Sequence, residues 1–254
     1  MAELVDAQVS EACCREAVEV RFFSSAPYLK GDAPSKHPFF FAFSAALRET
    51  LFLRTEFIQA ITAHQTAFGL DLNSVQIGRL ADYYDLIQEH NPLLHLVGPS
   101  TPEDFAVRHI LESLTLLAHL PQNAKLADVG TGAGLPSIPC LLVRDDLSAA
   151  LIESKEKKTA FLNEAISWLG LSSRVVTANK QYAEFDPAGY QFITCRALDK
   201  FTEKLPHLVR WSPRATLLIF GGENIGSELQ KFRRDVRREL MPLSERRFLF
   251  IAKP

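Results

Sequence analysis

The sequence predicts an α/β protein with a mostly parallel, twisted β-sheet, helices on both faces of the sheet and a helical N-terminal extension. Three observations lead to this class. Short apolar runs alternate with helical segments in the second half of the chain, a glycine-rich turn follows the first of these runs, and the earlier part shows only helical periodicity. We divide the 254 residues into an extension (1–53), a helical segment packed on the core (54–121) and an α/β domain (122–254).

The extension contains a Pro- and Gly-bearing stretch and the aromatic cluster PFFFAF at 38–43, which we interpret as buried packing rather than a partner site. We assign it no function. Three helices are expected in the helical segment. The first begins near Arg54, the second is capped by Ser74 and broken at Asn91-Pro92, and the third spans 102–120. The first helix should bury one face, formed by Phe57, Ile58, Ile61 and Phe68.

In the α/β domain, strands are expected at 125–129, 148–153, 174–178, 191–195, 215–220 and 247–252. Helices are expected from Ile138 onward and at 157–169, 200–209 and 225–240. Strands that alternate with helices of this length indicate a parallel sheet whose ligand crevice lies at the carboxyl ends of the strands.

The stretch DVGTGAGLP, Asp128 to Pro136, is the most informative part of the chain. Glycines let the backbone turn with positive φ and approach a ligand without a Cβ in the way. Gly130, Gly132 and Gly134 have the spacing G-x-G-x-G, which differs from the G-x-G-x-x-G spacing of dinucleotide folds. The loop therefore favours S-adenosylmethionine over a nicotinamide cofactor.

An acidic residue, Glu153, ends the second apolar run, 23 positions after Gly130. In doubly wound folds a carboxylate roughly 20 positions beyond the glycine loop accepts hydrogen bonds from the ribose hydroxyls of the cofactor. The alternative is that the glycines only turn the chain and that Glu153 is a solvated residue at the start of a helix.

Composition and charge limit which partners and which cellular location the protein can have. A formal net charge of −2 and a pI near 6.4 give no global attraction to nucleic acid, so a polyanionic partner would need a local basic patch. The seven histidines lack H-x-x-x-H spacing, so we expect no metal site.

We expect a cytoplasmic protein for two reasons. No apolar run approaches the ~18 residues of a membrane span, and Glu3 and Asp6 stand where a signal peptide would carry positive charge. The cysteines also lack paired metal or disulfide spacing: Cys13, Cys14, Cys140 and Cys195.

Four segments of the chain are informative together: RHILESL at 108–114, DVGTGAGLP at 128–136, ESKEKKTAFL at 153–162 and CRAL at 195–198. In order and spacing they resemble the RsmG (GidB) family of bacterial ribosomal RNA methyltransferases. The likeness runs from about Glu56 to the C-terminus. It implies a Rossmann-like class I enzyme that transfers a methyl group from S-adenosyl-L-methionine to N7 of a guanosine in 16S rRNA. It also implies that the partner is 16S rRNA or the small ribosomal subunit. Separately, we expect a monomer.

The resemblance further implies roles for single residues. Asp128 would orient the glycine loop and Glu153 would hold the ribose. Arg196 would contact the cofactor or position the RNA and is the best catalytic candidate, the alternative being a salt bridge inside the rim of the sheet. The remaining cofactor-binding candidates are Gly130, Gly132, Gly134, Leu135, Tyr182, Ala183 and Glu184.

The chain also departs from the family pattern. Glu112 stands where the family has aspartate, HLV at 95–97 replaces N-L-T, and Phe220 stands where a lysine is expected after the fifth strand. Phe220 could stack on an RNA base, or it could be a core residue. Arg108 and His109 are expected to brace the glycine loop rather than to act as ligands.

For RNA, the segment KFRRDVRR is the candidate patch, because a helix there would place Lys231, Arg234 and Arg238 on one face. A solvated helical face is the alternative. Lys155, Lys157 and Lys158 lie closer to the predicted cofactor end. Two other functions also remain open: a small-molecule methyltransferase of the same fold, and a catalytically inactive relative that binds cofactor or RNA.

Overall fold

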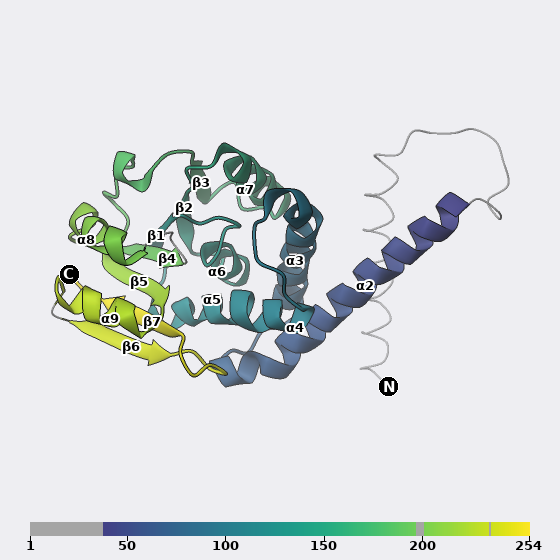
Figure 1. Cartoon of the computed structure of the whole chain (residues 1–254), viewed down its shortest axis with the longest axis horizontal. Helices are drawn as coiled ribbons and strands as arrows, with labels where there is room; N and C mark the ends of the chain where they lie inside the picture. Colours follow the sequence, from purple (N-terminus) through teal and green to yellow (C-terminus); the bar gives the residue numbers. More distant parts are fainter. Residues whose placement is uncertain (1–37, 197–200, 234) are drawn as a thin grey trace. The chain divides into compact units, whose positions relative to one another are not determined.

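The structure is a computed structural model that describes residues 38–196, 201–233 and 235–254, with the backbone alone for residues 38–47. The chain divides into two compact units between Ala46 and Leu47, inside helix α2 (Pro38–His64). Residues 1–37, including Cys13, Cys14 and most of the predicted extension, lie outside the described residues. The second unit contains the sheet and its helices (Figure 1).

A seven-stranded sheet with the order β3-β2-β1-β4-β5-β7-β6 forms the centre of the second unit. The neighbouring pairs from β3 to β5 are parallel, whereas β7 runs antiparallel to both β5 and β6. The predicted, mostly parallel sheet is therefore confirmed. The strands are β1 (Lys125–Val129), β2 (Ser148–Ile152), β3 (Val175–Ala178), β4 (Phe192–Arg196), β5 (Thr216–Gly221), β6 (Val236–Leu240) and β7 (Phe248–Ala252).

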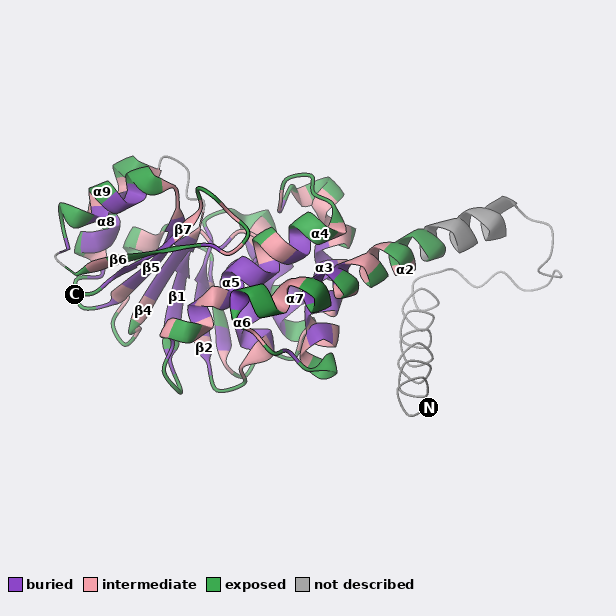
Figure 2. Cartoon of the chain, turned by 90° about the horizontal axis from the view of Figure 1, so that it is seen from below, coloured by how far each residue is buried: buried purple, intermediate pink, exposed green. Residues whose placement is uncertain are grey.

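Helices cover both faces of this sheet, and alternate residues of each strand supply the two cores (Figure 2). Leu126 of β1 packs toward the core that includes α3 (Ser74–Leu94), α6 (Ser137–Val143) and α7 (Glu156–Trp168). Its neighbour Ala127 packs toward α8 (Phe201–Trp211) and α9 (Glu223–Gln230) on the other face. This layering leaves the carboxyl ends of the parallel strands available for a ligand.

The helices before the sheet pack on one another and share a core with α6 and α7. Phe57 and Ile61 of α2 are fully buried, and Phe57 stacks on Tyr84 of α3 with ring centroids 4.5 Å apart. A short 3₁₀ turn, η1 (Gln65–Phe68), follows α2, and α3 is capped by Asn73, whose side chain accepts a hydrogen bond from the backbone N–H of Gln76 at 2.9 Å. The cap is therefore one residue earlier than Ser74.

The predicted break at Asn91-Pro92 was wrong, because α3 continues through Pro92 and ends at Leu94. Proline removes one backbone donor and crowds the preceding turn, and here only Leu93 and Leu94 follow it in the helix. The Asn91 carbonyl accepts the His95 N–H at 3.0 Å, and the Asn91 side chain accepts the Val97 N–H at 3.0 Å. These bonds close the end of the helix and fix the start of the loop that follows.

The expected third helix is present as a continuous helical stretch of mixed type. It passes from α4 (Pro102–Phe105) through a π-helical segment, η2 (Ala106–Leu111), and α5 (Glu112–Leu114) into a 3₁₀ segment, η3 (Thr115–His119). Thr101 caps its start by accepting the Asp104 N–H at 3.1 Å. A π-helical turn is wider than an α-helical turn and occurs frequently at functional sites.

The predicted helix 225–240 was wrong in its second half. Helix α9 ends at Gln230, and Val236–Leu240 forms the edge strand β6 paired with β7. Strand β7 would otherwise leave a row of backbone donors and acceptors without partners on this side, and β6 pairs with them. Arg233 anchors the connection, because its buried guanidinium donates to the carbonyls of Ser212 and Pro213, both at 2.9 Å.

Among the described residues, no helix has the length and apolar character needed to cross a bilayer. The same residues contain no cluster of three histidine, cysteine or carboxylate side chains arranged for a metal ion. Cys140 and Cys195 are both buried. Burial raises the pKa of the Cys140 thiol, which donates to the Ser113 carbonyl at 3.3 Å, so it lacks the features of a nucleophile.

Candidate active site

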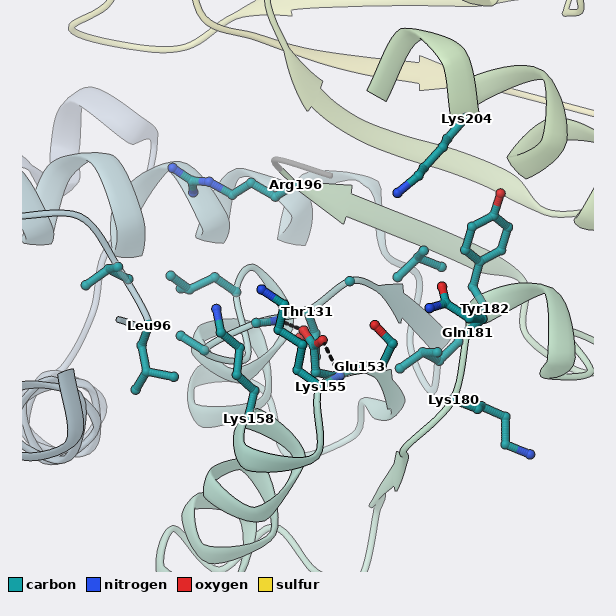
Figure 3. Close-up of a pocket in the computed structure, with 18 of the residues that line it drawn as sticks. Leu96, Thr131, Glu153, Lys155, Lys158, Lys180, Gln181, Tyr182, Arg196 and Lys204 are labelled. Atoms are coloured by element: carbon teal, nitrogen blue, oxygen red, sulfur yellow. Dashed lines mark hydrogen bonds between the residues drawn. The ribbon is translucent and has the colours of Figure 1, made fainter. Parts of the chain in front are cut away.

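A cavity of about 590 Å³ opens at the carboxyl ends of β1, β2 and β4, where the sheet order predicts a ligand crevice (Figure 3). Its volume lies within the roughly 300–1,000 Å³ typical of small-molecule sites. The glycine loop after β1, the residues after β2 and β3, the end of β4, helix α8 and the 96–98 loop all line it. The cavity therefore joins segments that lie far apart in the sequence.

The backbone conformation of this loop requires glycine at three positions. Gly130, Gly132 and Gly134 have φ angles of 67°, 59° and 100°, which side-chain-bearing residues rarely adopt. A Cβ at Gly134 would also lie 2.3 Å from Ile138 Cδ1. The Tyr83 hydroxyl, from α3, donates to the Ala133 carbonyl at 2.9 Å and braces the loop from below. The loop thus presents bare backbone to the cavity, as a closely bound cofactor requires.

Asp128 lies beneath the loop and is fully buried. Its Oδ2 accepts hydrogen bonds from the Thr131 hydroxyl at 2.8 Å and the Ser137 N–H at 3.3 Å, so it ties the start of the loop to the start of α6. Among the described residues, its Oδ1 has no hydrogen-bond partner. Burial raises the pKa of this carboxyl to about 7. Asp128 therefore acts on the loop and does not line the cavity.

Glu153 follows β2 and faces the glycine loop from the cavity wall (Figure 3). Its Oε2 accepts the Gly132 N–H at 3.1 Å and its Oε1 accepts the Lys155 N–H at 2.9 Å. Each carboxylate oxygen can accept a second hydrogen bond, so the ribose hydroxyls of a cofactor still have acceptors there. The carboxylate acceptors of Glu153 and the uncovered glycine loop fit S-adenosylmethionine.

The predicted cofactor-binding residues Tyr182, Ala183 and Glu184 do not all reach the cavity. They form the 3₁₀ turn η4 (Tyr182–Glu184), and of the three only Tyr182 lines the cavity. Glu184 points back to the turn, where its carboxylate accepts the Gln181 N–H at 3.3 Å. Gln181 lines the cavity beside Tyr182, and the sequence did not single it out.

Arg196, at the end of β4, lines the cavity, but its guanidinium is held by protein groups. It lies 3.3 Å from Glu112 Oε2, donates to the Ser113 hydroxyl at 3.4 Å and also donates to the Arg108 carbonyl. Arg247 Nε donates to the other oxygen of Glu112 at 2.6 Å. The salt bridge named as the alternative for Arg196 is present, and it orients a cation at the cavity wall.

The RNA candidates do not lie on one helix. Lys231 directly follows α9 and pairs with Glu228, and Arg238 lies on β6 and pairs with Glu223 at 2.8 Å. Arg234 lies outside the described residues. The prediction of a shared helical face was therefore wrong. Phe220 is 6% exposed, belongs to the core and lies 5.5 Å beneath the Arg196 guanidinium, so it does not present a face to RNA.

His109 lines the cavity from the π-helical segment, whereas we expected it to brace the loop. Burial and the nearby positive charges of Arg196, Arg108 and Arg247 lower its pKa to about 3. The imidazole is therefore neutral at physiological pH. Sequence periodicity could not show this, because the arginines come from β4 and from the residue before β7 as well as from the helix of His109 itself.

The lowered pKa of His109 predicts a pH-dependent stability. Between pH 6.5 and 3 the unfolded state takes up a proton that the folded state does not, so folding weakens as pH falls through this window. Relative to His109→Asn, the wild type should lose about 2 kcal/mol of unfolding free energy between pH 7 and pH 4.5. Urea unfolding of both proteins at several pH values measures this difference, and parallel pH curves would contradict it.

Known proteins resemble the chain in sequence and in fold. The family model described as rRNA small subunit methyltransferase G (GidB) matches residues 76–245. Proteins named ribosomal RNA small subunit methyltransferase G from Sorangium cellulosum and Neisseria meningitidis serogroup A are 33% and 36% identical. Their alignments cover 64% and 65% of this chain and 71% and 76% of theirs. A METTL16 methyltransferase domain structure aligns over 77% of this chain and 91% of its own with a TM-score of 0.51 at 14% identity, which shows a shared fold.

The sheet order, the bare glycine loop and the acidic residue after β2 define a class I S-adenosylmethionine-dependent methyltransferase. Because the family model covers most of the chain, this protein belongs to the RsmG (GidB) family of ribosomal RNA small subunit methyltransferases. The predictions of fold, family, enzyme class and cofactor are confirmed.

Proposed function

We propose that the cavity binds S-adenosylmethionine against the glycine loop and admits a guanosine of 16S rRNA, which is methylated at N7. The observation that supports this most strongly is that Gly132 and Glu153 line one cavity and are joined by a 3.1 Å hydrogen bond. In a member of this family, that arrangement offers a cofactor both a backbone cradle and a carboxylate.

We assign the cofactor contacts to residues that line the cavity. Glu153 would accept hydrogen bonds from the ribose hydroxyls, and Gly130 and Leu135 would pack against the cofactor. Tyr182 and Gln181 would flank the adenine side. Asp128 would act indirectly by holding Thr131 and the loop in place. Ala183 and Glu184 do not line the cavity, so we give them no direct contact.

Methyl transfer to guanine N7 requires few catalytic side chains. Bound S-adenosylmethionine supplies a methyl group on a sulfonium sulfur. Guanine N7 has an in-plane lone pair, so no base needs to remove a proton before attack. Holding a nucleophile in line and close to its target can contribute several kcal/mol to catalysis, and Arg196 and neutral His109 are the groups at the wall that could position the base.

The test is transfer of labelled methyl to small ribosomal subunits that lack the modification, followed by nucleoside mass spectrometry. The wild type should form labelled 7-methylguanosine. Glu153→Gln should raise the Kd for S-adenosylmethionine about tenfold, which corresponds to one ribose hydrogen bond to a charged group. Glu184→Gln is the matched control, because Glu184 does not line the cavity, and it should bind normally.

Other outcomes would select the alternatives. Label in a small molecule but not in RNA would favour a small-molecule methyltransferase of the same fold. Cofactor binding without transfer to naked 16S rRNA or to the small subunit would favour an inactive relative. We expect the protein to act as a monomer in the cytoplasm, where its rRNA substrate is located, and light scattering of the purified protein tests the monomer.

A further inference from the structure

Two lysines approach the mouth of the cavity from different sides. Lys204 extends from α8, and Lys158 extends from α7, and both ammonium groups are directed toward the cavity (Figure 3). Buried Leu205 and Leu208 fix α8 on the sheet, so the stem of Lys204 starts from a rigid helix. The two cations therefore occupy positions that the fold determines.

No residue that the structure describes forms a salt bridge with either ammonium group. Lys158 makes one long hydrogen bond, to the His95 carbonyl at 3.5 Å. Glu153 is the only carboxylate among the residues that line the described cavity, and its oxygens face the backbone of Gly132 and Lys155. The mouth thus has a local positive charge although the whole chain is slightly acidic.

The proposed reaction explains what anion would come here. An enzyme that modifies a base takes the nucleotide out of its stack and inserts the base into a pocket. When the base occupies the inner part of the cavity, its sugar and flanking phosphates remain at the mouth. Lysine binds phosphate as a compact point charge with three donors.

We propose that Lys204 and Lys158 form a two-sided clamp for the backbone phosphates that flank the target guanosine. This inference rests on the proposed function and assigns the RNA contact to the cavity mouth, in place of the basic helix expected from sequence. The family pattern places a lysine after the fifth strand, where this chain has the buried Phe220. Lys204 brings a cation to the cavity from a different helix.

The carboxylate of the cofactor is the competing partner for the same ammonium groups. The two possible partners predict different losses of affinity when a lysine is replaced. A lysine that binds the cofactor affects the Kd of S-adenosylmethionine, whereas a lysine that binds phosphate affects the affinity for RNA and its dependence on salt. The experiment therefore measures both quantities for each variant.

The test compares Lys204→Gln with Lys180→Gln. Lys180 lines the same cavity, but its side chain points away from it, so the control removes an equal charge from the same region (Figure 3). Binding to small ribosomal subunits is measured by filter retention from 50 to 300 mM salt, and cofactor binding by calorimetry. Lys158→Gln is measured in parallel.

We expect Lys204→Gln and Lys158→Gln each to weaken subunit binding about tenfold and to lower the slope of log K against log salt by about one. The cofactor Kd should stay within about twofold of the wild type, and Lys180→Gln should match the wild type in both measurements. Equal losses in Lys204→Gln and Lys180→Gln would overturn the clamp, as would a loss confined to cofactor binding. Because these are binding measurements, they test the clamp even if no 7-methylguanosine forms, which would instead contradict the proposed function.

Discussion

Gly134→Ala is expected to weaken binding of S-adenosylmethionine by about tenfold or more and to abolish most methyl transfer. The new Cβ would lie 2.3 Å from Ile138 Cδ1 and 2.7 Å from Ile138 Cγ1, and Ile138 is fully buried. Alanine would also have to adopt a φ of 100°. Such strain costs about 1–3 kcal/mol, and overpacking a core adds about the same amount. The loop is expected to shift, and calorimetric titration with the cofactor measures the effect.

Gly170→Ala is the control that separates backbone strain from steric collision of the new Cβ. Gly170 has a φ of 69° in the turn after α7, and a Cβ there would meet no atom within 4 Å. This control should lose about 1 kcal/mol of stability and keep its cofactor affinity. If Gly134→Ala bound the cofactor as tightly as Gly170→Ala, the loop would not need its bare backbone, and the assignment of the cradle would be wrong.

The parts of the fold that were predicted correctly have local signals. Each parallel strand is a short apolar run followed by a turn residue, and the glycine loop has positive-φ positions that the sequence marks with glycine itself. Glu153 could be placed at the cavity because a strand end and a loop have a fixed relation in doubly wound sheets. These inferences needed no knowledge of contacts between distant segments.

The errors arose where distant contacts decide the structure. Residues 225–240 have apolar side chains at helical spacing, yet Val236–Leu240 pairs with β7, whose open edge the sequence does not show. Pro92 was taken as a break, although α3 continues for two residues beyond it and is closed by bonds to Asn91 that the sequence does not show. The π-helical segment at 106–111 has no residue signature that periodicity would reveal.

The site was predicted only in part, because contacts between distant segments also determine which residues line it. Lys204 lies on a segment without a motif, and Gln181 lies one residue before the predicted cofactor-binding residues. Only the strand order brings both segments to the glycine loop. Phe220 was ambiguous as a single residue, since a phenylalanine at a strand end can be exposed or buried. The structure places it beneath Arg196. Long-range packing, rather than residue type, decides such cases.

Glu112→Gln is expected to destabilise the protein by about 3 kcal/mol or more and to reduce methyl transfer. Glu112 is 1% exposed and lies between two arginines, 3.3 Å from Arg196 and 2.6 Å from Arg247. Removing one partner of a buried ion pair leaves an uncompensated charge, which costs about 3–5 kcal/mol. Arg196 would also lose its orientation at the cavity wall. Urea unfolding and kcat/KM on small ribosomal subunits measure the two effects.

Glu223→Gln is the matched control, because it removes the same charge from an exposed pair, in which Glu223 lies 2.8 Å from Arg238. Exposed pairs contribute about 0–1 kcal/mol, so this variant should remain close to the wild type. The double variant Glu112→Gln/Arg247→Gln should recover part of the lost stability, since one of the two unpaired charges is then absent. If Glu112→Gln unfolded at the same urea concentration as Glu223→Gln, the buried carboxylate would not be what joins β7 and α5 to the wall of the active site.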